Sequence, residues 1–296
     1  MKRVAIIAAM PGELKPFLDS QAKEGWVHES RGDVRLWRLT WPGDQGEWTA
    51  ACAGAGQQAA IRAFAEVEKD GRIDQAISVG WVGALSHSFK CGKAYVVSGV
   101  IDMLTGERFE AADLTGRERE VGSHTQPSDK NEDVARMGHP ASSDSFPRSQ
   151  NRDLGHPGSF QIGRPKVLLV TSPKVADAAE KRRLAGAYHA DLVDMEAAGV
   201  ARLAAMRGIP FQCIKGVSDG FDEDLLDFNR FISPEGQFQT ARLLFFVLPR
   251  PWHWPALVRM GENSKKASQA IRDILLDNLN GPGAIANQNG DPNLKP

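Results

Sequence analysis

The sequence predicts an α/β fold in which helices cover both faces of a central sheet. Seven short apolar runs, each bounded by glycine or polar residues, have the length of buried strands. Amphipathic helical patterns lie between several of these runs, for example over residues 57–69 and 196–208. Strands that alternate with helices in this way form sheets that are buried on both faces.

The first predicted strand begins close to the N-terminus. Its apolar run resembles a secretion signal, but residues 11–13 (PGE) interrupt it, and we interpret it as a buried strand. The helix over 196–208 should end at Gly208, which readily adopts the left-handed conformation of a helix C-terminus, and Pro210 follows it. The predicted strands cover residues 4–10, 48–54, 76–83, 94–101, 166–172, 190–195 and 211–218.

We predict one domain over residues 1–260, a C-terminal helix at 261–280 and a disordered tail at 281–296. Residues 111–164 contain almost no clustered aliphatic side chains and cannot bury enough apolar surface to offset the entropy of ordering. They are predicted to form a mobile insertion, and a lid over the site is the alternative. Residues 242–260 are apolar and aromatic, but this segment is too short and too rich in proline to span a bilayer. We interpret it as the end of a core helix and a packed tryptophan-rich turn, with membrane, lipid-like substrate or partner contact as the less favoured interpretation.

The composition is that of an ordinary globular protein. The chain has 296 residues, 42% hydrophobic and 25% charged, with a formal net charge of −1, so it lacks the basic excess that nucleic-acid binding requires. Cys52, Cys91 and Cys213 are an odd number of cysteines, each expected in a strand or at a strand end, which indicates buried reduced thiols in a cytoplasmic protein. No CxxC or HxxxH spacing occurs, so we expect no metal site.

A glycine-rich segment at residues 54–59 (GAGQQA) resembles a dinucleotide-binding loop. Such a loop joins the first strand to the first helix and needs an acidic residue at the end of the following strand. Here the segment follows the second apolar run, and Asp74 precedes the next strand instead of closing it. We therefore predict a structural turn at this position.

Three acidic residues follow predicted strands, where α/β folds place their ligands: Glu13, Glu196 and Asp219. Each has a structural alternative, because Glu13 and Glu196 suit the first turn of a helix and Asp219 suits a Ser-Asp-Gly turn. Together they favour glycoside-type chemistry, in which one carboxylate activates water and another protonates the leaving group. Burial can keep such an acid protonated near neutral pH.

Three segments carry a resemblance to a known family: VAIIAAMPGEL (4–14), AISVGWVGALSHSFKCGKAYVVSGVID (76–102) and, most specifically, VDMEAAGVARLAAMRGIPFQCIKGVSDG (193–220). The chain resembles the nucleoside phosphorylase and nucleosidase superfamily, most closely the 5′-methylthioadenosine/S-adenosylhomocysteine nucleosidases, over residues 1 to about 110 and 165 to about 240. The resemblance implies a single-domain three-layer αβα sandwich with a central mixed sheet, a homodimer, a small-molecule nucleoside substrate, and no metal or redox cofactor.

The resemblance also implies catalytic roles for two residues. Glu13 would be the base that activates water, and Asp219 the acid that protonates the purine at N7. The implied substrate-binding residues are Trp81, Val175, Met195, Glu196 and Ser218, with Glu196 on the ribose hydroxyls, Met195 against the sugar, Ser218 beside the acid and the backbone near Val175 against the base.

Two departures from the family pattern bear on the reaction. The phosphate-binding arginines of the phosphorylases are replaced by Glu13 and Ser78, which favours water as the nucleophile. Trp81 stands where the nucleosidases usually have a small hydroxyl residue. We therefore expect a purine nucleosidase of the 5′-methylthioadenosine/S-adenosylhomocysteine class. The alternatives are a phosphorylase, an enzyme acting on a lipid-linked adenosine as in the hopanoid-associated branch, and a non-catalytic nucleoside-binding protein.

Overall fold

The computed structural model describes residues 2–22, 25–40, 46–112, 166–223 and 226–279. The predicted insertion, apart from its first two residues, and the predicted tail at 281–296 lie outside the described residues. All elements below belong to one compact unit, drawn from residues 1–118 and 166–296. Its strands are β1 (Arg3–Ala8), β2 (Val27–Arg31), β3 (Val34–Thr40), β4 (Glu47–Cys52), β5 (Gln75–Ala84), β6 (Ala94–Val97), β7 (Gly99–Asp102), β8 (Arg108–Glu110), β9 (Leu168–Thr171), β10 (Leu192–Asp194) and β11 (Phe211–Asp219).

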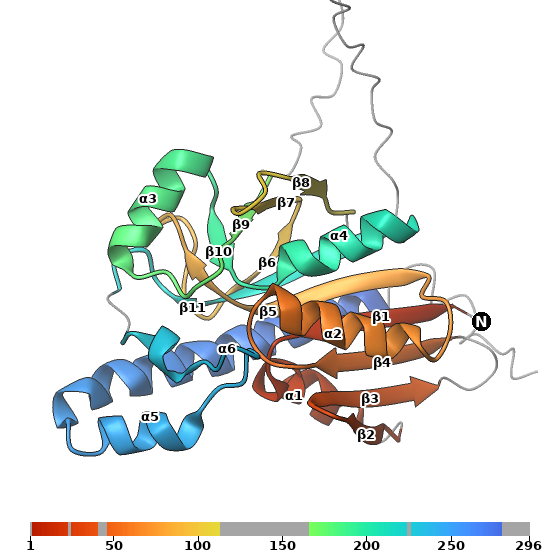
Figure 1. Ribbon diagram of the computed structural model, residues 1–296, viewed down its shortest axis with the longest axis horizontal. Coiled ribbons are helices and arrows are strands. Elements are labelled where there is room, and N and C mark those ends of the chain that lie inside the picture. The colour runs from red at the N-terminus through yellow and green to blue at the C-terminus, as the bar shows by residue number, and fades with distance from the viewer. Residues whose placement is uncertain (1, 23–24, 41–45, 113–165, 224–225, 280–296) are drawn as a thin grey trace, which may run out of the picture. The chain divides into compact units, whose positions relative to one another are not determined.

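One mixed sheet contains all of these strands (Figure 1). The main strand order is β2-β3-β4-β1-β5-β10-β9-β7-β8, and β11 lies between β5 and β6. The long strand β5 is the branch point, because it pairs in parallel with β11 along most of its length, in parallel with β1 through its first part, and antiparallel with β10 through its last residues. The carboxyl ends of β1, β5, β10 and β11 therefore come together around this strand.

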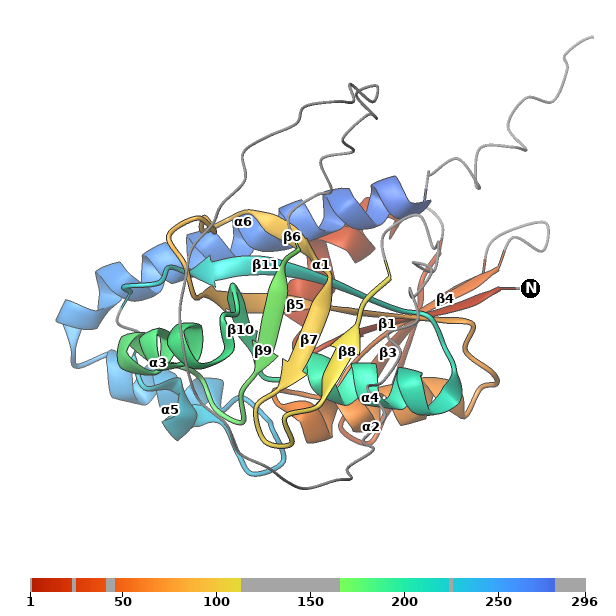
Figure 2. The same cartoon turned by 90° about the horizontal axis from the view of Figure 1, so that it is seen from above.

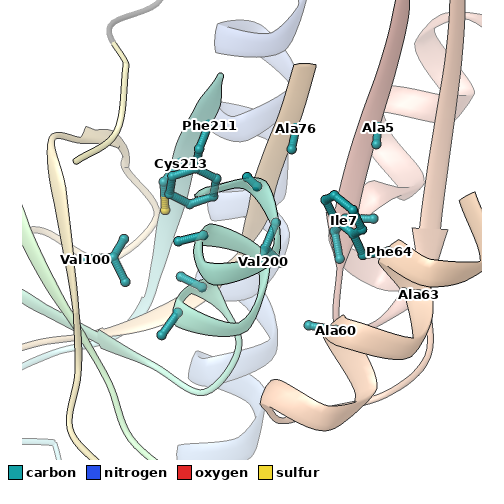
Figure 3. Close-up of a cluster of buried hydrophobic side chains, with 14 of the residues drawn as sticks. Ala5, Ile7, Ala60, Ala63, Phe64, Ala76, Val100, Val200, Phe211 and Cys213 are labelled. Carbon is teal, nitrogen blue, oxygen red and sulfur yellow. The ribbon is translucent and has the colours of Figure 1, made fainter. Parts of the chain in front are cut away.

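Helices cover both faces of the sheet, as predicted (Figure 2). On one face lie α1 (Pro11–Ser20) and α6 (Trp254–Leu279), and on the other α2 (Gln57–Glu68) and α4 (Ala197–Arg207). Alanines at the inner face of α2, including Ala60 and Ala63, let this helix approach the sheet closely, so that Phe64 packs beside Ile7 of β1 (Figure 3). A separate apolar cluster lies beneath α3 (Ala178–Tyr188), against β9 and β10.

Several details differ from the expectations. The apolar run at 94–101 is divided at Ser98, whose backbone N–H and hydroxyl both donate to the carbonyl of Val167 as the chain passes from β6 to β7. The edge strand β2 is mostly exposed and polar, which is why it has no apolar run in the sequence. Cys91 lies half-buried in a turn rather than in a strand. Helix α4 ends as predicted, with Gly208 in the left-handed conformation at φ 63°.

The C-terminal helix is longer than expected. Helix α6 begins at Trp254, inside the segment predicted to be a packed turn, and it is preceded by α5 (Thr240–Val247) and the short 3₁₀ helix η4 (Pro251–His253). Another 3₁₀ helix, η3 (Phe228–Phe231), follows β11. Pro249 and Pro251 lie between α5 and α6. Because proline has no backbone N–H to donate, the two helices do not join into one continuous helix.

Candidate active site

A cavity of about 330 Å³ opens at the converging carboxyl ends of β1, β5, β10 and β11. This is the position at which open α/β sheets place their ligands. Seven residues singled out in the sequence line this one cavity: Glu13, Trp81, Val175, Met195, Glu196, Ser218 and Asp219.

Glu13 is buried at the start of α1 and is held by main-chain donors. Its Oε2 accepts from the backbone N–H groups of Ala9 (2.8 Å) and Met10 (2.9 Å), and its Oε1 accepts from that of Trp81 (2.9 Å). Burial raises the pKa of Glu13, while these N–H groups and the Lys215 ammonium oppose the rise. The carboxyl group therefore has a fixed orientation and a higher basicity than a glutamate in water.

Glu196 joins the glycine-rich segment to the site. Its Oε1 accepts from the N–H of Gly56 (2.8 Å) and its Oε2 from that of Met195 (3.2 Å). Gly56 has φ 94°, a conformation that residues with a side chain rarely adopt. Burial first, and then the nearby Asp194 carboxylate, raise the pKa of Glu196 to about 8. The segment GAGQQA thus supplies a backbone donor to a carboxyl group in the cavity.

Asp219 lies at the end of β11, beside a break in the strand register. The pairing of β11 with β5 shifts between Val217 and Asp219, which is the geometry of a β-bulge. The bulge brings Ser218 next to the acid, and the Ser218 hydroxyl donates to Asp219 Oδ1 at 2.7 Å. Burial raises the pKa of Asp219, and Lys181 opposes this rise.

Lys181, which the sequence did not single out, pairs with Asp219. This lysine of α3 is fully buried, and its ammonium donates to Asp219 Oδ2 and to the carbonyl of Gly220 (2.6 Å). A Cβ at Gly83 would lie 2.9 Å from Asp219 Oδ2 and 3.0 Å from Lys181 Cε, so a glycine there leaves room for the pair. Asp219, the candidate acid, therefore has the Lys181 ammonium as a hydrogen-bond donor.

A second buried ion pair supports the site from within the sheet. The ammonium of Lys215 lies 2.9 Å from Asp194 Oδ2 and donates to Ser78 Oγ at 3.1 Å. Burial lowers the pKa of Lys215, but Asp194 and then the other acidic neighbours together outweigh burial and raise it. Asp194 also accepts from the Thr171 hydroxyl (2.7 Å) and from the N–H of Ala197 (2.9 Å) at the start of α4, which fixes the neighbouring Glu196.

Trp81 connects three elements at one wall of the cavity. Its indole N–H donates to Ser268 Oγ of α6 at 2.8 Å, and that hydroxyl donates to the carbonyl of Gly12 in α1 at 3.3 Å. A Cβ added at Gly12 would lie 3.1 Å from the Trp81 ring, so the indole fits closely against α1. The tryptophan is held in one position, where it reduces the space next to Glu13.

Val175 presents its backbone to the side chain of Asn229 from η3. The Val175 N–H donates to Asn229 Oδ1 at 2.8 Å, and the Asn229 amide donates to the Val175 carbonyl at 3.1 Å. The Asn229 side chain therefore takes up both the N–H and the carbonyl of Val175. The resemblance places this part of the backbone against the purine base. Asn229 was not singled out in the sequence, since an isolated asparagine in a polar loop carries no distinguishing pattern.

The wall of the cavity opposite the carboxylates is apolar. Its residues come from η3, the loop after it, α5 and α6: Phe228, Ile232, Phe238, Leu243, Leu257 and Met260. A neighbouring cavity of about 340 Å³ shares three of these side chains, those of Phe228, Leu257 and Met260. The site therefore combines a polar floor at the sheet with an extended apolar side.

Two findings limit the chemistry of the described residues. They contain no group of three or more His, Cys, Asp or Glu side chains arranged to hold a metal ion. Burial raises the pKa of the Cys52 and Cys213 thiols to about 12, and it also raises the pKa of the half-buried Cys91, so the reactive thiolate form is disfavoured at neutral pH.

Comparisons with known proteins place the chain in a family. No curated protein is significantly similar in sequence. Among solved structures, the chain is similar to a futalosine hydrolase mutant of Helicobacter pylori, with 12% identity, a TM-score of 0.58 and coverage of 95% of this chain and 99% of that one. It is also similar to 5′-methylthioadenosine nucleosidase of Arabidopsis thaliana, with 14% identity, a TM-score of 0.59 and coverage of 95% of each chain.

A third similar structure is the 5′-methylthioadenosine/S-adenosylhomocysteine nucleosidase of Neisseria meningitidis in complex with methylthio-immucillin-A. It has 16% identity, a TM-score of 0.57 and coverage of 94% of this chain and 99% of that one. These likenesses confirm the predicted fold, a mixed central sheet with flanking helices. The sequence profile of the phosphorylase superfamily matches residues 3–244, and the chain belongs to this superfamily.

Proposed function

We propose that this protein hydrolyses the N-glycosidic bond of an adenosine-type nucleoside, of the 5′-methylthioadenosine/S-adenosylhomocysteine class, to free adenine and the sugar. The observation that carries the proposal is the convergence of three buried carboxyl groups, those of Glu13, Glu196 and Asp219, on one cavity. Each is held by a directed donor, which is the fixed arrangement that acid–base chemistry at a glycosidic bond requires.

In this mechanism Glu13 takes a proton from water as the bond to the base breaks. Its three main-chain donors keep one carboxylate orientation, and its raised pKa makes it a better base once it is ionised. Glu196, at the adjoining edge of the cavity, accepts hydrogen bonds from the ribose hydroxyls. Because its pKa is about 8, it holds a proton at neutral pH and can also donate to a hydroxyl.

The leaving base receives its proton from the pair of Asp219 and Lys181. Asp219 Oδ1 accepts from the Ser218 hydroxyl and Oδ2 accepts from the Lys181 ammonium. Burial raises the pKa of Asp219 and so favours the protonated form of this carboxyl group. A proton can then pass from Lys181 through Asp219 to N7 of the purine.

Water, rather than phosphate, is the proposed nucleophile. A phosphate beside Glu13 would face a buried carboxylate. The cations that line the cavity in the described part of the chain are Lys174 and Lys181, and Lys181 is already paired. The apolar wall favours a nucleoside whose 5′ substituent is apolar. A lipid-linked adenosine is the second candidate because the neighbouring cavity extends that wall.

The test is release of adenine from 5′-methylthioadenosine, S-adenosylhomocysteine and adenosine, with and without phosphate, and with the sugar product identified. Free sugar with no phosphate requirement would support the hydrolase, whereas sugar 1-phosphate would refute it. An adenosine with a long 5′-alkylthio chain tests the second candidate. Binding of all four compounds without release of adenine would identify a nucleoside-binding protein, and Asp219→Asn is the control for enzyme-dependent release.

A further inference from the structure

The outer surface of α5, η4 and the start of α6 is apolar. We call residues 240–261 the apolar arm. Of the nine large hydrophobic side chains that are exposed in the described part of the chain, six lie in this arm: Leu244, Phe245, Leu248, Trp252, Trp254 and Val258. Phe245 is 79% exposed and Trp252 68% exposed. Large exposed apolar side chains gathered in one short segment mark a contact surface.

The inner side of the arm is already occupied. Phe246 packs edge-on against Phe231 with ring centroids 5.5 Å apart, and the indole N–H of Trp254 donates to the carbonyl of Val247 at 3.1 Å. Leu243 and Leu257 line the substrate cavity. Because these contacts fix the arm from within, its outer side chains cannot turn inward without emptying the cavity wall. Figure 1 shows α5 and the first turns of α6 extending past the sheet.

The arm carries positive charge and no negative charge. Arg242, Arg250 and Arg259 lie within residues 240–261, and this segment contains no aspartate or glutamate, although the whole chain has a net charge of −1. The guanidinium of Arg250 lies over the Phe246 ring, 4.1 Å from its centroid. Arginines beside exposed tryptophan and phenylalanine complement a surface that is apolar inside and anionic outside.

We propose that the apolar arm binds the surface of an anionic lipid bilayer. Phe245, Leu248 and Trp252 enter the headgroup region, and the arginines contact lipid phosphates. The contact is peripheral, because no described helix is long and apolar enough to cross a membrane. A second copy of this chain is a poorer occupant, since a two-fold contact would place the same positive surface against itself. Lipid binding by the arm does not depend on the proposed reaction, but the arm's inner side lines the cavity, so bound protein would hold its substrate site close to the bilayer.

The experiment is co-sedimentation of the full chain with phosphatidylcholine vesicles, with and without phosphatidylglycerol. We expect binding to the vesicles that contain phosphatidylglycerol, weakened by salt. The double variant Phe245→Ser/Trp252→Ser should lower the partition coefficient by about tenfold or more. Met206→Ser is the matched control, because Met206 is 74% exposed on α4, and this change should leave binding unaltered. Arg242→Gln/Arg259→Gln should weaken binding only to the anionic vesicles.

Two results would overturn the proposal. One is equal vesicle binding by the Phe245/Trp252 variant and by the Met206 control, when both have native circular dichroism and thermal unfolding. The other is no vesicle binding by the wild type. If size-exclusion chromatography with light scattering then showed that Phe245→Ser alone converts a dimer to a monomer, the arm would be a contact between copies. Adenine release in solution, measured on the same variants, distinguishes this failure from failure of the proposed reaction.

Discussion

Replacing Asn229 with alanine should strengthen adenine binding. The Asn229 amide offers an acceptor to the Val175 N–H and a donor to the Val175 carbonyl. Adenine presents the same pair, a ring nitrogen beside an amino group, so base and asparagine compete for one backbone edge. A neutral hydrogen bond contributes about 0.5–1.5 kcal/mol net, so two contribute about 1–3 kcal/mol. Removing the competitor should raise adenine affinity between about 5-fold and about 150-fold.

Isothermal titration calorimetry of adenine binding to the wild type, Asn229→Ala and Asn229→Asp measures this effect. Aspartate keeps the acceptor for the Val175 N–H but loses the donor to its carbonyl, so we expect an intermediate gain in affinity. Thermal unfolding without ligand should show that both variants are folded and slightly less stable than the wild type. Unchanged affinity would mean that the base does not use this backbone edge, and weaker affinity would mean that Asn229 itself holds the ligand.

Three further predictions concern the carboxyl groups and Trp81. Asp219→Asn and Glu13→Gln should each lower kcat by about 10²- to 10⁴-fold while adenine still binds, and near-normal rates would refute the assigned roles. Glu196 has a folded-state pKa of about 8 against an ordinary value of 4.5, so its protonation stabilises the fold at low pH and this contribution is lost as the pH rises through 8. Glu196→Gln should therefore remove up to about 4 kcal/mol of the fall in unfolding free energy between pH 5 and pH 8.5, and identical pH dependence in urea titrations would contradict the shift. Ser268→Ala removes the acceptor of the Trp81 indole and should cost about 1–3 kcal/mol, and strict additivity with Trp81→Phe in a double-mutant cycle would show that the two do not interact.

The carboxyl groups were predictable because their positions follow from chain order. A residue that directly follows a buried strand lies at the edge where neighbouring strand ends meet, and this places Glu13, Glu196 and Asp219 at one cavity. The structural alternatives were also correct in part, since Glu13 accepts from the N–H of Met10 at the start of α1. One Glu13 oxygen thus orders the helix start, while the other accepts from the N–H of Trp81 in the cavity wall.

The lysine partner could not be predicted, because no local pattern distinguishes it. Lys181 lies in the run Lys181–Arg183, and such a charge run on a helix normally indicates a solvated face. Arg182 and Arg183 are indeed exposed. Only the packing of α3 against β9 and β10 turns Lys181 inward to Asp219. This inward position depends on tertiary packing, which no local sequence pattern shows. The same holds for Asn229, whose hydrogen bond to Val175 joins residues 54 positions apart in the sequence.

The charge balance of the site decides which nucleophile it suits. Asp194, together with Glu13, Glu196 and Asp219, faces two buried ammonium groups, those of Lys181 and Lys215. Lys174 also lines the cavity, so the four carboxyl groups outnumber the three lysines around the site by one.

A site rich in carboxyl groups suits the positive charge that develops on the sugar as a glycosidic bond breaks, and it disfavours a phosphate dianion. This balance makes a further demand on the substrate. Its neutral parts must account for ground-state binding, because the carboxylates contribute most in the transition state. The apolar wall formed by Phe228, Phe238 and Leu257 is the surface that can supply that binding, and the 5′ substituent is the part of a nucleoside that can reach it.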